Sequence, residues 1–401
     1  MKKKCVFASV LVLFSIVALA AQKNTDEAPR VFLLDGRELL ANRNRIVAKD
    51  KDLGPALTAL EKRADDHLER GIYSVVRKSV TPPSGDKHDY MSQAPYFWPD
   101  PKSKTSLPYI RRDGERNPEI EKITDHKNLD NMIEAVDTLS LAYYFSRNEK
   151  YAARAAALLR GFFLDPAMRM NPNLNFGQGI PGITTGRGIG LIETRYLVKV
   201  VDAISLLDGS KAWTAADKKG LQDWFGAFLT WMQESKNGRD EAAAKNNHGT
   251  YYDVQIVSFA LFTGKTDVAK KVLEEAKQKR IALQVEPDGS QPLELERTKS
   301  WSYSVMNLDG LVMLAELGDR VGVDLWHFET KDGRGIRKAI DYLYPFTIGE
   351  KWKHEQLGEW PPHILYPVLR KAAGKYSDEK FKAMIAKVPA ADKASVEYLI
   401  D

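Results

Sequence analysis

The chain has 401 residues, of which 43% are apolar and 10% aromatic, so it can bury a sizeable core. Its formal net charge is +5, and 54 acidic residues nearly balance 59 basic ones. This balance argues against nucleic acid as a partner, and a polyanion would have to meet a local basic cleft. Cys5 is the only cysteine. A mature chain that lacks it has no thiol, which excludes a cysteine nucleophile, a thiolate metal site and disulfides.

The first predicted element is a secretory signal peptide over residues 1–21. Three lysines precede an apolar stretch from Val6 to Leu19, and the sequence Ala18-Leu19-Ala20 stands before a polar start. The stretch is too short to be a stable membrane anchor. We therefore expect an exported protein, periplasmic or secreted, whose residues 22–401 form one domain with its core over about 50–350.

Two long irregular segments are predicted to be loops. The first, Ala94–Pro118, contains five prolines together with aromatic residues and arginines, and the second, Asn171–Gly190, contains six glycines. Long loops inside a compact domain are usually functional or disordered. Aromatic rings stack on sugar faces and arginines pair with carboxylates, so we expect both loops to frame a binding cleft, with straps packed across the helices as the alternative. The binding candidates in the first loop are Tyr96, Trp98, Arg111 and Arg112.

Helical periodicity dominates from Leu129 onward. Apolar residues recur at i, i+3 and i+4 up to Phe162, and the polar turn Arg147–Lys150 divides this stretch into a helical hairpin. Strand-like alternation is scarce. The pattern predicts an all-α protein, an (α/α) barrel or toroid of antiparallel helix hairpins around a central cleft. Further helical segments are predicted at 192–207, at 221–229 behind a capping box of Thr214 and Asp217, at 252–262 and at 268–276.

Four residues with complementary chemistry lie near predicted helix starts. Asn247 and His248 stand before a helix that we expect to begin at Thr250, where side chains and the helix N-terminus can face an anion. Arg297 and Tyr303 are six residues apart, which a straight helix would separate by about 240°. We therefore expect Arg297 in a loop or irregular turn and Tyr303 at or just inside the next helix.

These four residues have the groups that β-elimination on a uronic acid needs. The proton at C5 becomes acidic when the charge of the adjacent carboxylate is neutralised, and an amide, an imidazole and a guanidinium can do this. A phenol whose pKa is lowered by nearby Arg and His can take the C5 proton and protonate the departing 4-oxygen. The plainer alternatives are a structural histidine and a helix tyrosine with its hydroxyl at the surface.

Several separated motifs together resemble the helical alginate lyase superfamily. The resemblance covers about residues 50–350 and is closer to polysaccharide lyase family thirty-eight than to family five. It implies an (α/α) toroid that cleaves acidic polysaccharides by β-elimination. The motifs are Lys245–Asp253, the segment with Arg297 and Tyr303, Tyr96–Pro99, Leu107–Gly114 and Met170–Gly179.

The resemblance also implies roles for individual residues. By motif, Asn247, His248 and Arg297 neutralise the substrate carboxylate, and Tyr303 acts as base, acid or both. Weaker matches add cleft residues that would bind the substrate, namely Asn175, Gln178, Arg187 and Tyr252.

The stereochemistry of the sugar gives an expectation about the substrate. β-Mannuronate and β-glucuronate carry the C5 hydrogen and the 4-oxygen on the same side, so one tyrosine could take and return the proton in a syn elimination. α-Guluronate places them on opposite sides and would need two separated groups. We therefore expect cleavage of mannuronate-rich alginate, or of β-1,4-glucuronan, to 4,5-unsaturated uronides.

Two other functions remain open at this point. A uronide-specific glycoside hydrolase would need two carboxylic acids across a cleft, and Asp253, Glu294 and Glu296 are available, although we expect them to be supporting partners. A noncatalytic protein that binds acidic glycans could use the same aromatic residues. No HExxH or EF-hand pattern is present and the seven histidines are not at ligand spacing, so we expect no metal or cofactor. No oligomeric state is predicted.

Overall fold

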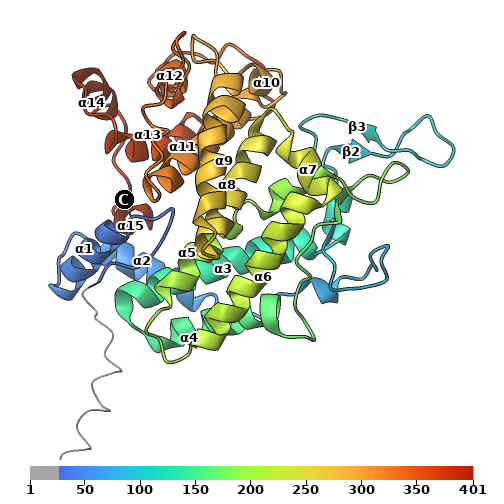
Figure 1. The fold of residues 1–401 in the computed structure, drawn as a ribbon, viewed down its shortest axis with the longest axis horizontal. Helices are drawn as coiled ribbons and strands as arrows, with labels where there is room; N and C mark the ends of the chain where they lie inside the picture. The colour runs from blue at the N-terminus through green and yellow to red at the C-terminus, as the bar shows by residue number, and fades with distance from the viewer. Residues whose placement is uncertain (1–26, 401) are drawn as a thin grey trace, which may run out of the picture.

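The computed structural model describes residues 27–400, and this part of the chain is mostly helical (Figure 1). The predicted all-α class is thereby confirmed. The predicted signal peptide and Cys5 lie outside the described residues. Within residues 27–400, no helix combines the length and apolar character that crossing a membrane requires.

The hairpin predicted after Leu129 consists of α3 (Asp125–Ser146) and α4 (Glu149–Leu159). Arg147 ends α3 in the left-handed region, with φ of 57°, which reverses the chain. The side chain of Asn148 then caps α4 by accepting a backbone N–H. α3 also packs against α2 (Gly54–Asp65) and α5 (Leu197–Leu206).

A second group of helices surrounds α8 (Asn247–Phe262), which is buried on nearly all sides. The predicted capping box of Thr214 and Asp217 is present at the start of α6 (Ala215–Glu234). Because α8 lacks a polar face, it needs neighbours all round. These neighbours include α5, α6, α7 (Lys236–Ala242), α9 (Thr266–Ala276) and α11 (Ser300–Asp319).

The two ends of the described chain lie together on one side of the molecule (Figure 1). There, α1 (Gly36–Val47) contacts α15 (Glu397–Ile400). The buried carboxylate of Asp202 in α5 accepts hydrogen bonds from three consecutive backbone N–H groups of residues 32–34. This contact fixes the N-terminal segment to the helical body. The remaining α-helices are α10 (Pro292–Leu295), α12 (Ile336–Leu343), α13 (Tyr366–Ala373) and α14 (Glu379–Ile385).

The two segments predicted as loops contain three short strands, and a fourth strand lies just before the first segment. β1 (Met91–Gln93) pairs in parallel with β4 (Phe176–Gly179), so the second loop is attached to the chain just before the first. β2 (Phe97–Trp98) pairs antiparallel with β3 (Ile110–Arg111), and Figure 1 shows this hairpin at the edge of the helical body. Neither segment is structureless, because backbone pairing satisfies part of its polar groups.

One continuous cluster of buried apolar side chains extends from Val31 to Leu399. Aromatic packing is dense where α6 meets α8. The ring of Phe225 lies 4.9 Å from that of Phe259 and 5.2 Å from that of Trp224, between centroids. This core supports the helix ends that carry the polar residues described next.

Candidate active site

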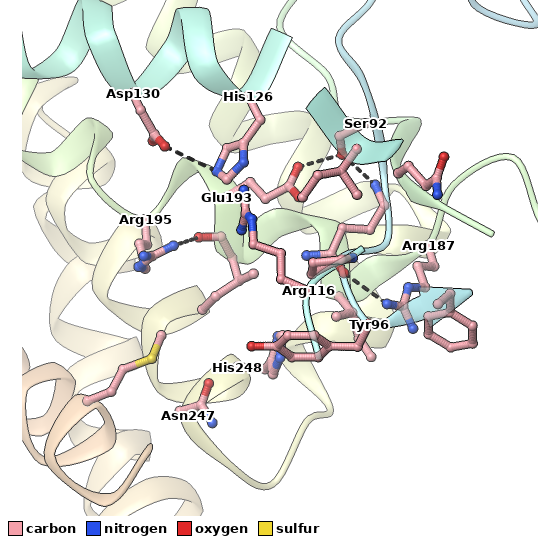
Figure 2. Close-up of a pocket in the computed structure, with 18 of the residues that line it drawn as sticks. Ser92, Tyr96, Arg116, His126, Asp130, Arg187, Glu193, Arg195, Asn247 and His248 are labelled. Carbon is pink, nitrogen blue, oxygen red and sulfur yellow. Dashed lines mark hydrogen bonds and ion pairs between the residues drawn. The ribbon is translucent and has the colours of Figure 1, made fainter. Parts of the chain in front are cut away.

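A cavity of about 1090 Å³ opens among the start of α3, the 3₁₀ segment Gly188–Thr194, the N-terminus of α8 and the start of α11. The strands β2 and β3 contribute to its wall. In the view of Figure 2, Asn247 and His248 lie at the lower end of the cavity and His126 and Asp130 at the upper end. The predicted residues that line it are Tyr303, His248, Asn247, Arg297, Tyr96, Arg111, Gln178 and Arg187.

His248 lies in the first turn of α8, because the helix begins at Asn247 and not at Thr250 as predicted. Its Nδ1 is 2.7 Å from a carboxylate oxygen of Glu241, which is buried in α7. A carboxylate accepts hydrogen bonds, so Nδ1 carries the proton and Nε2 of the neutral ring is the basic nitrogen. The arrangement fixes the tautomer and gives His248 one atom that can accept a proton.

The position after His248 must be a glycine for a steric reason. A Cβ atom at this position would collide with the carbonyl oxygen of Ala244 and with the guanidinium of Arg280. Arg280 donates hydrogen bonds to that carbonyl and to the carboxylate of Asp253, at 2.7 Å each. The missing side chain therefore lets a buried ion pair reach the N-terminal end of α8.

Arg297 lies between α10 and α11, and Tyr303 lies in the first turn of α11, as predicted from their spacing. The Cζ atom of Arg297 is 3.9 Å from the centroid of the Tyr303 ring. Two guanidinium nitrogens of Arg297 donate to Asp113, at 2.8 and 3.1 Å. Burial acts to raise the pKa of Asp113, but its hydrogen bonds and charge contact with Arg297 outweigh this and hold the pKa well below its usual range.

The environment of Tyr303 differs from the prediction in one respect. Burial, followed by a hydrogen bond with Tyr96, raises the pKa of Tyr303 above its ordinary value, and the charge of Arg297 only partly opposes this. The expected lowering of this pKa is therefore wrong for this structure. The physical reason is that Asp113 balances much of the Arg297 charge while burial disfavours a phenolate.

Arg187 is a partly buried cation in the cavity wall. Its Nη2 donates to the side-chain oxygen of Gln178 at 2.9 Å, its Cζ lies 5.2 Å from the centroid of the Phe97 ring, and its Nε is buried without a hydrogen-bond partner. Burial and then the charge of Arg111 lower the pKa of Arg187. Gln178 itself has φ of 51°, a strained conformation of the kind that clusters at ligand sites. The pair is arranged to meet an anion.

Four predicted binding residues lie outside the cavity lining. Arg112 stacks on the Trp98 ring, with Cζ 5.2 Å from the centroid, and the Trp98 indole donates to the backbone. The side-chain oxygen of Asn175 accepts from the Trp231 indole at 3.1 Å. The hydroxyl of buried Tyr252 donates to a backbone carbonyl of α6 at 3.1 Å. Each of the four side chains thus has a partner within the protein.

Several residues of the site were not predicted from the sequence. Asp113 lies in the motif Leu107–Gly114, next to the predicted binding residues Arg111 and Arg112. The contact of Glu241 with His248 could not be predicted from local spacing, because the two residues lie in different helices, α7 and α8. Glu193 lines the cavity while its buried carboxylate accepts hydrogen bonds from Tyr90 and Ser92, at 2.7 and 2.6 Å. Further lining residues that were not predicted include Arg116, Glu121, His126, Lys127, Asp130 and Arg195.

The carboxylates considered for a hydrolase do not line this cavity. Asp253 forms a buried ion pair with Arg280, and buried Glu294 accepts hydrogen bonds from Asn247. Both are supporting partners, as expected, and Glu296 is exposed. Among residues 27–400, no group of three or more His, Cys, Asp or Glu side chains is arranged to hold a metal ion.

Comparison with known proteins agrees with this geometry. The sequence model of the family described as alginate lyase matches residues 74–352, whereas no curated protein matches the chain. The crystal structure of an alginate lyase from Bacteroides ovatus is similar over 93% of this chain and 99% of that chain, with 39% identity and a TM-score of 0.89.

More distant structures share the fold alone. Alginate lyase A1-III from Sphingomonas species A1 covers 94% of this chain and 97% of its own, with 15% identity and a TM-score of 0.58. A variant of A1-III in complex with a tetrasaccharide has the same coverage and identity, and a TM-score of 0.56. The predicted toroid of helix hairpins is thus confirmed, and the chain belongs to the alginate lyase family of polysaccharide lyases.

Proposed function

We propose that this protein cleaves alginate by β-elimination and prefers mannuronate-rich chains, with β-1,4-glucuronan as the second candidate substrate. The observation that carries the proposal is the convergence of Tyr303, Arg297, His248 and Asn247 on one cavity, with a guanidinium against the tyrosine ring. Family membership and the name of the Bacteroides ovatus structure support alginate as the substrate.

The charge distribution of the cavity suits a polyuronate. Arg187 and Arg195 stand at the two ends of the segment Gly188–Thr194, and both line the cavity. Each has a buried Nε without a hydrogen-bond partner, and within the described residues neither pairs with a carboxylate. Unpaired guanidiniums of this kind are receptors for carboxylates. A substrate with a carboxylate on every sugar would supply the missing partners.

The reaction can be assigned to the four converging residues. Arg297 and the amide of Asn247, together with His248 when its Nε2 carries a proton, stabilise negative charge on the carboxyl group as the C5–H bond breaks. The Tyr303 oxygen, once deprotonated, takes the C5 proton and returns it to the 4-oxygen as the C4–O4 bond breaks. The electron pair of the C5–H bond becomes the C4–C5 double bond, and Tyr303 ends in its starting state.

A single tyrosine restricts the stereochemistry. It reaches the C5 hydrogen and the 4-oxygen only when both lie on one face of the sugar, as in mannuronate and glucuronate. The hydroxyl of Tyr96 lies 3.0 Å from that of Tyr303, and the hydrogen bond between them favours the protonated phenol. We further propose, from the N-terminal sequence, that the protein acts after export, in the periplasm or outside the cell.

A substrate panel tests the proposal. Purified enzyme is incubated with polymannuronate, polyguluronate and glucuronan, and the near-ultraviolet absorbance of the unsaturated product is followed together with product size. We expect the fastest rise with polymannuronate. Fast cleavage of polyguluronate alone would refute the single-tyrosine mechanism. New reducing ends without absorbance would indicate a hydrolase, and binding without product would indicate a glycan-binding protein.

A further inference from the structure

Glu294 is a buried carboxylate that makes two contacts with one catalytic-site residue. One oxygen accepts the backbone N–H of Asn247 and the other accepts its side-chain Nδ2–H, both at 2.7 Å. Glu294 and Asn247 are each 1% exposed. Glu294 comes from the short helix α10, 47 residues further along the chain. The contact therefore joins two segments that are independent in sequence.

The contact determines how the Asn247 amide is turned. A carboxylate only accepts hydrogen bonds, so the NH₂ group must face Glu294 and the carbonyl Oδ1 must face elsewhere. Because the amide is planar, this also fixes the direction of the second N–H. In Figure 2 the side-chain oxygen of Asn247 points upward in the view, toward the other residues of the cavity. Oδ1 is buried and has no hydrogen-bond partner among the described residues.

Burying a polar atom without a hydrogen-bond partner destabilises a fold, and such atoms are rare in proteins. The cost is explained if the orientation serves the substrate, whose hydroxyl groups can donate to Oδ1 while its carboxylate receives the second N–H. Burial raises the pKa of Glu294, and its hydrogen bonds with Asn247 and the charges of His248 and Arg297 oppose this rise. Glu294 is thus linked electrostatically to the other two residues proposed to act on the substrate carboxyl.

We propose that Glu294 is a positioning residue of the lyase reaction, which acts by holding the Asn247 amide in the one orientation that stabilises the developing charge. The inference rests on the proposed function. Its rival is a purely structural role, in which Glu294 caps the N-terminus of α8 through the backbone N–H alone, because the side chain of Asn246 makes no capping bond.

The substitution Glu294→Gln separates the two roles. The glutamine oxygen can still accept the backbone N–H of Asn247, so the cap is kept. Its NH₂ group then meets the NH₂ of Asn247, and the asparagine amide must turn over to offer its oxygen. We expect kcat to fall by about 10²-fold, the order expected when a reacting group is misplaced, with an unchanged melting temperature.

Binding is measured separately in the Tyr303→Phe background, where turnover is suppressed. Oligomannuronate affinity should change much less than kcat between Tyr303→Phe and Tyr303→Phe/Glu294→Gln, because Asn247 acts on charge that develops in the transition state. The matched control is Glu296→Gln. Glu296 is exposed, lies two residues further on and does not line the cavity, so this variant should behave as wild type.

A paired substitution tests the orientation directly. In Asn247→Asp/Glu294→Gln the hydrogen bond between the side chains is restored with its polarity reversed. We expect the melting temperature to recover relative to Asn247→Asp, where two carboxylates face each other. Activity should stay low, because the group that faces the substrate carboxylate is now an anion. Recovery of activity together with stability would overturn the proposal in favour of a structural role.

Two further results would also overturn it. One is a kcat of Glu294→Gln equal to that of wild type, and the other is a loss of melting temperature and affinity in proportion to kcat. A wild type that yields no unsaturated product from any polyuronate refutes the proposed function instead. In that case the side-chain amide resonance of Asn247 still tests the orientation, since it must shift in Glu294→Gln and not in Glu296→Gln.

Discussion

The hydroxyl oxygens of Tyr96 and Tyr303 lie 3.0 Å apart although 207 residues separate them in the chain. One of the two must donate to the other, and the substrate has to be accommodated beside this pair.

Tyr303→Phe removes the oxygen that is proposed to exchange protons with the substrate, and it leaves the ring under Arg297. We expect kcat to fall by at least about 10³-fold while oligosaccharide affinity persists. Absorbance assays and calorimetry measure the two quantities, and near-wild-type turnover would exclude Tyr303 as the catalyst.

Tyr96→Phe is the companion variant. It removes a hydrogen bond that helps to raise the pKa of Tyr303, so the phenol should titrate at lower pH. Only the deprotonated tyrosine is a base, and its fraction increases with pH. The kcat/KM of wild type should therefore rise on the alkaline side, and the rise should begin at lower pH in Tyr96→Phe. A profile that is flat above neutrality in both enzymes would move the base role to His248.

Arg297→Lys tests whether the guanidinium matters beyond its charge. The planar fork binds Asp113 through two nitrogens and stacks on the Tyr303 ring, and an ammonium group cannot do both. We expect kcat to fall by about 10²-fold or more with little change in melting temperature. Full activity of the lysine variant would reduce Arg297 to a general positive charge. Arg112→Lys, which alters an arginine outside the cavity, is the control and should stay active.

Glu241→Gln tests the orientation of His248. The glutamine oxygen can still accept from Nδ1, but the negative charge that strengthens this hydrogen bond is lost. We expect kcat to fall by about tenfold with an unchanged melting temperature, because a neutral acceptor holds the ring less firmly. A wild-type kcat in Glu241→Gln would show that the charge of Glu241 does not contribute to the reaction.

The pH dependence of stability can be assigned to Asp217. Hydrogen bonds from Arg160, followed by those from Thr214, lower the pKa of Asp217 to about 2. A carboxyl with a lowered pKa stabilises the fold above its ordinary pKa of about 3.9, and this contribution is lost as pH falls towards 2.

Asp217→Asn should therefore lower the free energy of unfolding by about 1–2 kcal/mol at neutral pH. It should also flatten the decrease in stability between pH 4 and pH 2. The control is Asp223→Asn in the same helix, whose exposed pair with Lys219 contributes little. Denaturant unfolding of the three proteins at several pH values measures the difference. An equal acid slope in wild type and Asp217→Asn would contradict the assignment.

The features that could be predicted from the sequence depend on neighbouring residues. The turn at Arg147, the capping box of Thr214 and Asp217, and the positions of Arg297 and Tyr303 around a helix start all follow from local spacing. The start of α8 was placed three residues late, because the acceptor for the N–H of Asn247 is Glu294, far along the chain.

The features that could not be predicted depend on distant pairing. Asp113 reaches Arg297 across 184 residues, and the strands β1 and β4 meet across more than eighty. The pKa of Tyr303 is raised mainly by burial, and the residues next to Tyr303 in the sequence do not reveal how deeply it is buried. These distant contacts surround the proposed reacting groups, whereas those groups themselves could be identified from local motifs.

The segment between Ala94 and Pro118 supplies both the hydroxyl partner of Tyr303 and, through Asp113, the anchor of Arg297. One segment of the chain thus contacts both residues of the proposed catalytic pair. If this hairpin were lifted away, the phenol would lose its neighbour and the guanidinium its counter-ion at the same moment. Both contacts of the proposed reactive centre therefore depend on the correct placement of this one segment.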